Sequence, residues 1–278
     1  MFTSKQKREK TKRLTRKRLG VNKRAASPAI SMVIITGVTA ILVLVAGNYA
    51  YQVLERQQGA SEFDAVRKSF LAFDDAVRDV AWDRGGSRSA RFTISRGSLN
   101  VVLNTSLVVN VAEYPSASYS TSTGYVQYGL STSYVSFGEG YESYFLGDNN
   151  TVVSANAESF ARALVKQEFG KLSIIMGYRV RAFREGLTTL ANSTQVNYVD
   201  ILILRINATN TASQIGDFDL VAKNVGLTTV SRGPYNVVSG NSCSVSVGLG
   251  AATDSVIVGL DPGKVVFNFI ISDVRIST

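Results

Sequence analysis

Hydrophobic residues are concentrated in one long block near the start of the chain. No charged side chain occurs between Arg24 and Glu55, and nineteen uncharged, mainly apolar residues run from Ala29 to Gly47 (AISMVIITGVTAILVLVAG). Nineteen helical residues are enough to cross the hydrocarbon core of a bilayer. Ten of them are Ile, Leu or Val, which favour insertion by about 3 to 6 kcal/mol before polar costs are counted. The block therefore predicts a transmembrane helix.

Two other kinds of segment share part of this sequence pattern. A buried helix of a soluble domain would need partners on every side, because apolar residues surround this helix completely. A secretory signal peptide has a shorter apolar stretch that ends at a small-residue cleavage site. Here the stretch continues without a break into a second helical pattern, which an excised signal would not need. A retained membrane helix is the favoured interpretation.

The second helical pattern is a single apolar stripe with spacings of three and four, which indicates one face of a helix. It predicts that the helix continues to Trp82 and ends at Arg84-Gly85-Gly86. Two interpretations of the stripe remain, a seam between subunits or packing on the chain's own β-domain, and we favour the second. The charged residues off the stripe, Asp74 among them, are expected to fill the other faces of the helix, and Glu62 and Asp75 are expected to be solvated. The stripe consists of Phe63, Val66, Phe70, Phe73, Val77 and Val80.

From Ser87 onward the period changes to that of strands, rich in β-branched and aromatic residues. One segment, 155–169 (ANAESFARALVKQEF), instead predicts a short helix. Asp261-Pro262-Gly263 predicts a hairpin turn between the last two strands. The expected fold is α+β: a long N-terminal hydrophobic helix, then a mainly antiparallel, β-sandwich-like headpiece with one short helix. The predicted strands cover 91–96, 98–103, 106–111, 198–206, 218–223, 255–260 and 264–271.

The charge distribution sets the orientation of the membrane helix. Residues 1–25 hold eleven of the thirty Lys and Arg and one acid, whereas the rest of the chain has nineteen basic and twenty acidic residues. Positive flanks stay in the cytoplasm, so everything after Gly47 is expected outside. A basic arm that binds nucleic acid or anionic lipid is the alternative. No aromatic residue beyond Phe2 interrupts the arm to stack on bases, so no nucleic-acid partner is expected.

The sequence contains no residue pattern that is typical of a catalytic site. Histidine is absent, and with it the usual general base, the commonest metal ligand and any Ser-His system. Phosphate-binding loops, dinucleotide-binding loops and paired-cysteine metal motifs are also missing. Asp217 and Asp219 share one face of a strand, but a solvent-facing pair is the simpler interpretation. We expect no enzyme, no cofactor and no metal, and Cys243, the only cysteine, leaves only an intermolecular disulfide open.

Four Asn-X-Ser/Thr motifs are candidate N-glycosylation sites, at Asn104, Asn149, Asn192 and Asn207. Chance alone predicts about three in a chain of this composition. Asn149 lies in the best predicted surface turn. The Ser-, Thr-, Tyr- and Gly-rich segment 114–144 predicts either an exposed binding surface or, preferably, ordinary sheet and loop.

The junction between the basic arm and the apolar block reads Lys23-Arg24-Ala25-Ala26-Ser27-Pro28-Ala29-Ile30. It resembles the class III signal peptide of archaeal type IV pilins, which prepilin peptidase cuts before the hydrophobic segment. The matching bond is Ala25 to Ala26, flanked by Lys23 and Arg24. Ser27 and Pro28 suit the cap and first position of a helix. Ile30 stands where bacterial pilins carry Glu, which argues against a bacterial pilin.

The resemblance covers about sixty residues and implies a domain plan and a function. The plan is a basic leader (1–25), a pilin helix (26–84) and an extracellular headpiece (87–278), with 87–150 and 170–278 as candidate subdomains. The implied function is a surface-filament subunit that forms a homo-oligomer through its N-terminal helix and displays its headpiece for adhesion. Implied partners are the membrane, prepilin peptidase and the assembly platform with its ATPase. The precursor would be a single-pass membrane protein with a cytoplasmic N-terminus, and the assembled subunit extracellular.

Two further functions remain open from the sequence. A single-pass, membrane-anchored binding protein would keep its helix in the bilayer and use the headpiece to hold a ligand. An archaellin-like motility-filament subunit is the other alternative, although the opening residues of archaellins are missing here.

Overall fold

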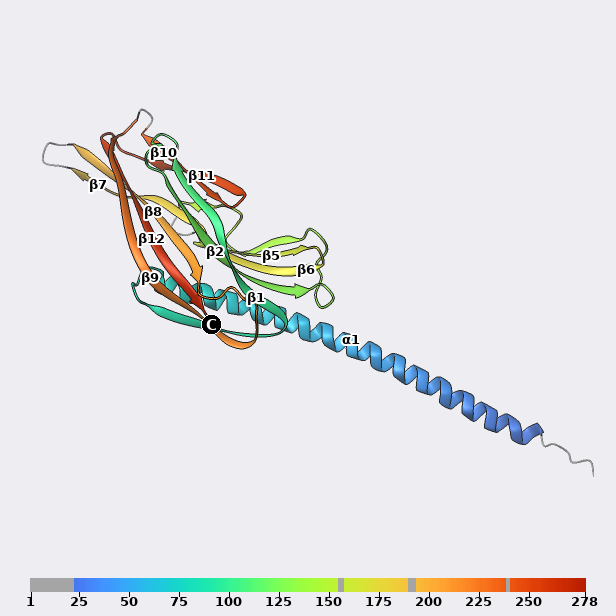
Figure 1. Ribbon diagram of the computed structural model, residues 1–278. Helices are drawn as coiled ribbons and strands as arrows, with labels where there is room; N and C mark the ends of the chain where they lie inside the picture. The colour runs from blue at the N-terminus through green and yellow to red at the C-terminus, as the bar shows by residue number, and fades with distance from the viewer. Residues whose placement is uncertain (1–22, 155–157, 190–193, 239–240) are drawn as a thin grey trace, which may run out of the picture. The chain divides into compact units, whose positions relative to one another are not determined.

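The computed structural model describes residues 23–154, 158–189, 194–238 and 241–278, with side chains from residue 29 onward (Figure 1). Contacts divide the chain into two compact units, Met1–Val53 and Leu54–Thr278. A long N-terminal helix followed by a strand-rich domain confirms the predicted α+β class. The elements are α1 (Lys23–Ala81), β1 (Ser87–Val111), β2 (Tyr119–Ser131), β3 (Glu142–Leu146), β4 (Val152–Val153), β5 (Ala161–Glu168), β6 (Lys171–Tyr178), β7 (Val180–Thr189), β8 (Gln195–Ala208), β9 (Gln214–Asn236), β10 (Ser242–Leu249), β11 (Ala252–Gly259) and β12 (Lys264–Ser277).

The helix ends close to the predicted stop. Its last residue is Ala81, one before Trp82, and Gly85 adopts a φ of 86°, which glycine tolerates without steric cost. At the other end α1 begins at Lys23, four residues before the predicted start at Ser27, and it includes Pro28. The side chain of Ser27 lies outside the described ones, so its capping role stays a prediction.

The apolar stripe of α1 packs on the chain's own sheet, which confirms the favoured interpretation. All six predicted stripe residues are buried in one cluster with β1, β2, β5, β6 and β9. Phe92 of β1 is the central partner, because Phe70 and Phe73 meet its ring edge-on at centroid distances of 5.6 and 6.4 Å. Edge-to-face pairs of this kind add to the free energy of apolar burial. The stripe is therefore a core seam within the second unit.

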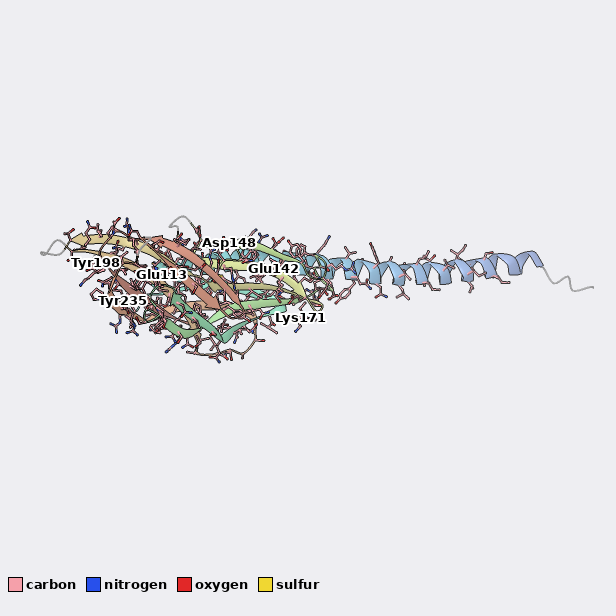
Figure 2. All side chains as sticks on the ribbon, turned by 90° about the horizontal axis from the view of Figure 1, so that it is seen from above. Glu113, Glu142, Asp148, Lys171, Tyr198 and Tyr235 are labelled. Atoms are coloured by element: carbon pink, nitrogen blue, oxygen red, sulfur yellow. The ribbon has the colours of Figure 1, made fainter. Side chains whose placement is uncertain are left out.

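The strands of the described residues form one twelve-stranded sheet. The main path is β3-β5-β6-β2-β1-β9-β12-β8-β7-β4, and β10 and β11 extend from β1. Only β12 with β8 and β4 with β7 pair in parallel, so the predicted antiparallel character is confirmed. A second core cluster joins the later part of β1 and β10 to β7, β8 and β12, which gives this part its sandwich-like packing. Figure 2 labels Lys171 and Glu142 at one end of the unit Leu54–Thr278 and Tyr198 and Tyr235 at the other.

The predicted short helix over 155–169 is wrong. Residues 155–157 lie outside the described ones, and 161–168 form strand β5, which pairs antiparallel with β6. The side chains of Ala161, Ala163, Val165 and Gln167 are buried in alternation, a period of two. The segment is rich in good helix formers such as Ala, Leu and Lys, so its composition suggested a helix. Pairing with the neighbouring strands outweighed this helix propensity.

Other strand predictions need smaller corrections. The three strands predicted within 91–111 are parts of one strand, β1. Asp261-Pro262-Gly263 forms a turn, but β11 and β12 do not pair: β11 pairs with β10, and β12 lies between β8 and β9. A Cβ on Gly263 would collide with the Gln195 carbonyl oxygen, so the glycine is required where this turn passes β8. Of the Tyr-rich segment, Tyr114 and Tyr128 are buried, Tyr141 is exposed, and the remaining tyrosines are intermediate.

Candidate functional site: the apolar helix and its anchoring residues

The first unit presents an apolar surface on all sides of α1. Fourteen large apolar or aromatic side chains from Ile30 to Leu54 are each at least 50% exposed. Side chains project from both edges of this helix in Figure 2. The stretch from Ala29 has the length and composition of a membrane span, with a mean hydropathy of 2.6 in its most apolar window. A membrane anchor and a signal sequence both satisfy this description.

Polar groups inside the apolar surface are satisfied within the helix. The hydroxyls of Thr36 and Thr39 donate to the carbonyl oxygens of Met32 and Ile35 at 2.8 and 2.7 Å. These bonds lower the cost of placing threonine in hydrocarbon. A Cβ added to Gly37 would meet nothing within 4 Å, so its side of the helix is open to a close neighbour. Such small positions allow helix backbones to approach in membranes.

The predicted cleavage residues occupy the first turn of α1. Lys23, Arg24, Ala25 and Ala26 are helical, but their side chains are outside the described ones, as is the leader 1–22. Cleavage at Ala25 therefore stays a prediction.

Glu62 holds the outer part of α1 to the sheet, which corrects the expectation of a solvated charge. Its carboxylate accepts backbone N–H bonds from Ser95, Arg96 and Gly97 at 2.9 to 3.2 Å. The pairing of β1 with β9 shifts register between Ile94 and Leu99, which leaves these amides without ladder partners there. A single carboxylate thus satisfies three neighbouring donors.

One side-chain hydroxyl also reaches this carboxylate. The Tyr128 hydroxyl donates to Glu62 Oε1 at 2.9 Å, and burial together with Glu62 raises the pKa of Tyr128 far above its ordinary value. A Cβ on Gly97 would collide with the Tyr128 ring, so glycine is needed for this approach. Arg96 pairs with Glu55 at 3.3 Å and lies over the Tyr134 ring at 5.2 Å.

Asn224 of β9 caps the C-terminal end of α1. Its side-chain amide is fully buried and donates to the carbonyl oxygens of Val80 and Ala81 at 3.1 and 2.7 Å. The Ser272 hydroxyl also donates to the Ala81 oxygen. The last carbonyls of a helix have no partners within it, and buried ones must find them elsewhere. Both ends of the docked segment are therefore held by polar contacts.

Asp74 is buried, which also corrects the expectation of a solvent-facing charge. It is 3% exposed, and burial raises the pKa of its carboxyl from 3.8 to about 6, against the opposing attraction of Arg78. By contrast, Asp217 and Asp219 are exposed as expected, and Asp217 pairs with Arg91 at 3.8 Å.

The candidate glycosylation sites differ in accessibility. Asn104, Asn149 and Asn207 have exposed side chains, and Asn192 lies outside the described residues. Asn104 adopts a φ of 66° at an irregularity of β1. In the motif of Asn149 the hydroxyl of Thr151 is buried and donates to the Val247 carbonyl oxygen at 2.7 Å, whereas Thr209 in the motif of Asn207 is exposed.

Within the described residues no group of three or more Asp, Glu or Cys has the arrangement of a metal site. The anchoring roles of Glu62 and Asn224 were not visible in the sequence. Both depend on partners 33 to 144 positions away, and the only local signal was a charged residue beside the apolar stripe. Comparison with family models, curated proteins and solved structures finds no match to this chain.

Proposed function

We propose that the chain is a structural subunit of an archaeal type IV pilus-like surface filament, which displays its sheet domain outside the cell for adhesion or surface contact. The observation that carries this proposal is the division of α1 by burial. The large apolar side chains from Ile30 to Leu54 are exposed, whereas Phe63, Phe70 and Phe73 are buried against the chain's own sheet. An apolar helix without partners of its own needs either lipid or other helices around it.

The same surface serves both environments. In the precursor it lies in the bilayer, and in the filament it packs against the helices of other copies. Lipid tails and apolar helices have similar polarity, so hydrophobic transfer supplies little driving force for extraction. Close packing at Gly37, Ala40 and Gly47 and an assembly ATPase must supply it. Prepilin peptidase would first remove the basic leader, because eleven cations cannot enter a helix bundle without partners.

Mass analysis of the mature protein from its native cells, or from cells that also express an archaeal prepilin peptidase, tests the proposal. The expected product begins at Ala26. Ala25→Leu should block cleavage, because the peptidase of this family requires a small residue there. Ala29→Leu is the matched control, the same change four residues later, and should be cut normally. An uncut wild-type chain, or one cut after Gly47, contradicts the proposal.

A membrane-anchored binding protein is the second candidate. A cavity of about 690 Å³ in the sheet domain, lined in part by Trp82 and Arg181, is the observation that favours it. Surface filaments sheared from cells and analysed by mass spectrometry separate the two, because only a filament subunit should be a component of them.

A further inference from the structure

Unpaired buried polar atoms gather in one place in the sheet domain. Among the described residues, the buried side-chain atoms without a hydrogen bond of normal geometry are Asp74 Oδ1, the Tyr178 hydroxyl and the Nε atoms of Arg179 and Arg181, and Asp74 and Tyr178 lie close enough for each to shift the pKa of the other. Asp74 comes from the outer part of α1, and the other three are alternate or adjacent residues at the junction of β6 and β7. Such an atom costs roughly 1 to 3 kcal/mol of stability when no partner reaches it, and a polar ligand beside the cluster would recover part of this cost.

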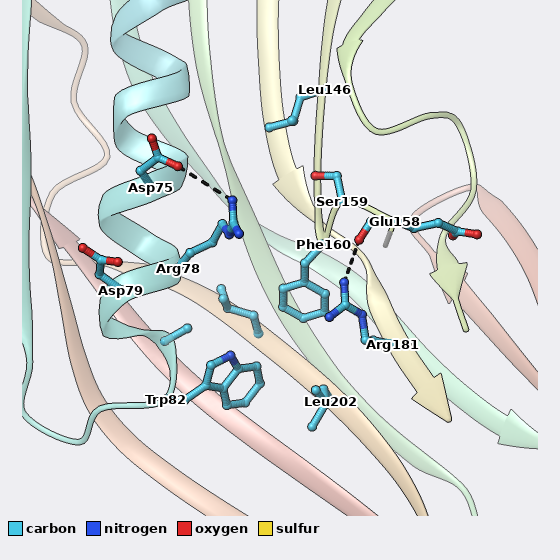
Figure 3. Close-up of a pocket in the computed structure, with 12 residues that line it drawn as sticks. Asp75, Arg78, Asp79, Trp82, Leu146, Glu158, Ser159, Phe160, Arg181 and Leu202 are labelled. Carbon is cyan, nitrogen blue, oxygen red and sulfur yellow. Dashed lines mark hydrogen bonds and ion pairs between the residues drawn. The ribbon is translucent and has the colours of Figure 1, made fainter. Parts of the chain in front are cut away.

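A cavity opens beside Arg181, one member of this cluster. It has a volume of about 690 Å³, in the range of small-molecule sites, and it lies between the end of α1 and strand β7 (Figure 3). Arg78 reaches it from α1 and Arg181 from β7, while Trp82 and Phe160 supply aromatic rings. All of these residues belong to the unit Leu54–Thr278.

Two guanidinium groups and one carboxylate, that of Asp75, face the cavity. In Figure 3 the guanidinium groups of Arg78 and Arg181 extend toward each other past the Phe160 ring, while the carboxylates of Asp79 and Glu158 point away to opposite sides. Asp79 instead pairs with Arg88 at 3.8 Å. The only carboxylate paired with Arg78 is that of Asp75, at a long 3.7 Å, among the described residues.

Arg181 is the better anion-binding group of the two. One of its amino groups donates to the Glu158 carbonyl oxygen at 2.7 Å, and its guanidinium lies 5.5 Å from the centre of the Phe160 ring. Neither contact neutralises its charge. Burial and the neighbouring charge of Arg179 lower the pKa of Arg181, so an anion beside it would relieve an unfavourable concentration of positive charge.

The aromatic rings give the cavity a platform for a ring-shaped ligand. Trp82 is 41% exposed, and its ring lies 6.1 Å from that of Phe160 at 47°. An exposed tryptophan beside donors and acceptors is suited to the apolar face of a sugar ring, whose hydroxyls then point outward. The Asp75 carboxylate and the Ser159 side chain also line the cavity.

We propose that this cavity binds an acidic sugar residue, with its carboxylate held by Arg181 and Arg78 and its ring against Trp82 and Phe160. Arginine matches a carboxylate with two parallel donors, which a neutral sugar cannot exploit. A simple anion would leave the aromatic platform unused. The inference does not depend on filament assembly, because every residue it uses lies in the sheet domain.

Trp82 is the only tryptophan of the chain, so intrinsic fluorescence reports directly on this cavity. The full chain, purified in a detergent without a sugar headgroup, is titrated with sodium glucuronate, glucose and sodium acetate while the emission of Trp82 is recorded. We expect a saturable change with glucuronate, half-complete at or below about 10 mM. Glucose and acetate should each require at least a tenfold higher concentration.

Variants identify the groups that carry binding. Arg181→Gln should weaken glucuronate binding at least tenfold, and Arg184→Gln is the matched control, because Arg184 lies on the same strand but pairs with Asp261 at 2.6 Å. Arg78→Gln changes an exposed side chain of α1 and should weaken binding without disturbing the fold, as checked by circular dichroism. The absence of a saturable response, an equal response to glucose or acetate, or undiminished binding in both cavity variants would overturn the proposal.

Discussion

The hydroxyl of Tyr128 lies 2.9 Å from the Oε1 atom of Glu62, although the two residues are 66 positions apart and come from β2 and α1. The same carboxylate accepts the backbone amides of residues 95–97 in β1. Helix and two strands are therefore joined through one side chain. Apolar packing along the stripe holds the helix to the sheet, but it tolerates sliding. Directional bonds at Glu62 fix the position along the helix axis at which the stripe can pack.

Glu62→Gln should destabilise the sheet domain by about 2 to 4 kcal/mol. A neutral amide accepts weaker bonds than a carboxylate, and its NH₂ group would face backbone donors. Urea unfolding of the full chain in detergent, followed by circular dichroism, measures the change. Glu168→Gln is the matched control, since Glu168 forms a half-exposed ion pair with Lys166 that contributes less than about 1 kcal/mol. Equal unfolding midpoints for the two variants would show that Glu62 does not anchor the helix.

Asn224→Ala should cost on the order of 3 kcal/mol. The substitution removes the donor to the Val80 and Ala81 carbonyl oxygens at a site that water does not reach. Hydrogen exchange in the last turn of α1 should accelerate more than exchange in its middle. Asn236→Ala, an exposed position on the same strand, is the control and should change the free energy of unfolding by less than about 0.5 kcal/mol. Unchanged exchange at residues 78–81 would contradict the capping role.

The sequence predicted the features that depend on local periodicity. The spacing of the stripe from Phe63 to Val80 located the helix face that meets the sheet, because a helix buries one side whatever it packs against. The pairing of strands was harder to predict from the sequence. The turn at Asp261-Pro262-Gly263 looked like a hairpin, yet β12 lies between β8 and β9, partners that no local pattern specifies. Glu62 and Asp74 are charged and therefore looked like surface residues. They face the sheet because β1 brings backbone donors to Glu62 and β6 covers Asp74, and no local sequence pattern predicts either contact.

Leu42→Arg should reduce membrane insertion. Replacing leucine by arginine near the middle of the span costs about 3 kcal/mol on the insertion scale, which consumes most of the favourable free energy of the segment. Carbonate extraction of expressing cells should release a larger share of this variant than of wild type. Leu187→Arg, at an exposed position of β7, is the control and should remain membrane-bound. Equal retention of both variants would show that the apolar stretch does not reside in the bilayer.

Cys243 should be unreactive in the folded protein. It is fully buried in the core cluster of β10, and burial raises the pKa of its thiol to about 12, so almost none is thiolate at pH 8. A maleimide or disulfide reagent should label it only after unfolding in urea. A Ser246→Cys variant provides a partly exposed thiol on the same strand as a positive control. Rapid labelling of native wild type would contradict this burial, and a disulfide between copies through Cys243 is not expected.

Asp74 should make the sheet domain more stable at mildly acidic pH than at neutral pH. Burial raises its carboxyl pKa from 3.8 to about 6, so between these values the folded state binds a proton that the unfolded state does not. The charged form is therefore destabilising above pH 6, by about 3 kcal/mol, and this cost disappears as the pH falls toward 4. Arg78 reduces the cost and Asp75 increases it, but burial outweighs both.

Asp74→Asn removes the titration while keeping the shape of the side chain. Its free energy of unfolding should exceed that of wild type by up to about 3 kcal/mol at pH 7.5, and the two should converge near pH 4. Urea unfolding at half-unit pH steps measures the difference. Asp64→Asn, at an exposed position of the same helix, should show no such convergence. A constant difference between Asp74→Asn and wild type across this range would mean that folding does not raise the pKa of Asp74, because a raised pKa must change the stability difference between pH 4 and 7.5.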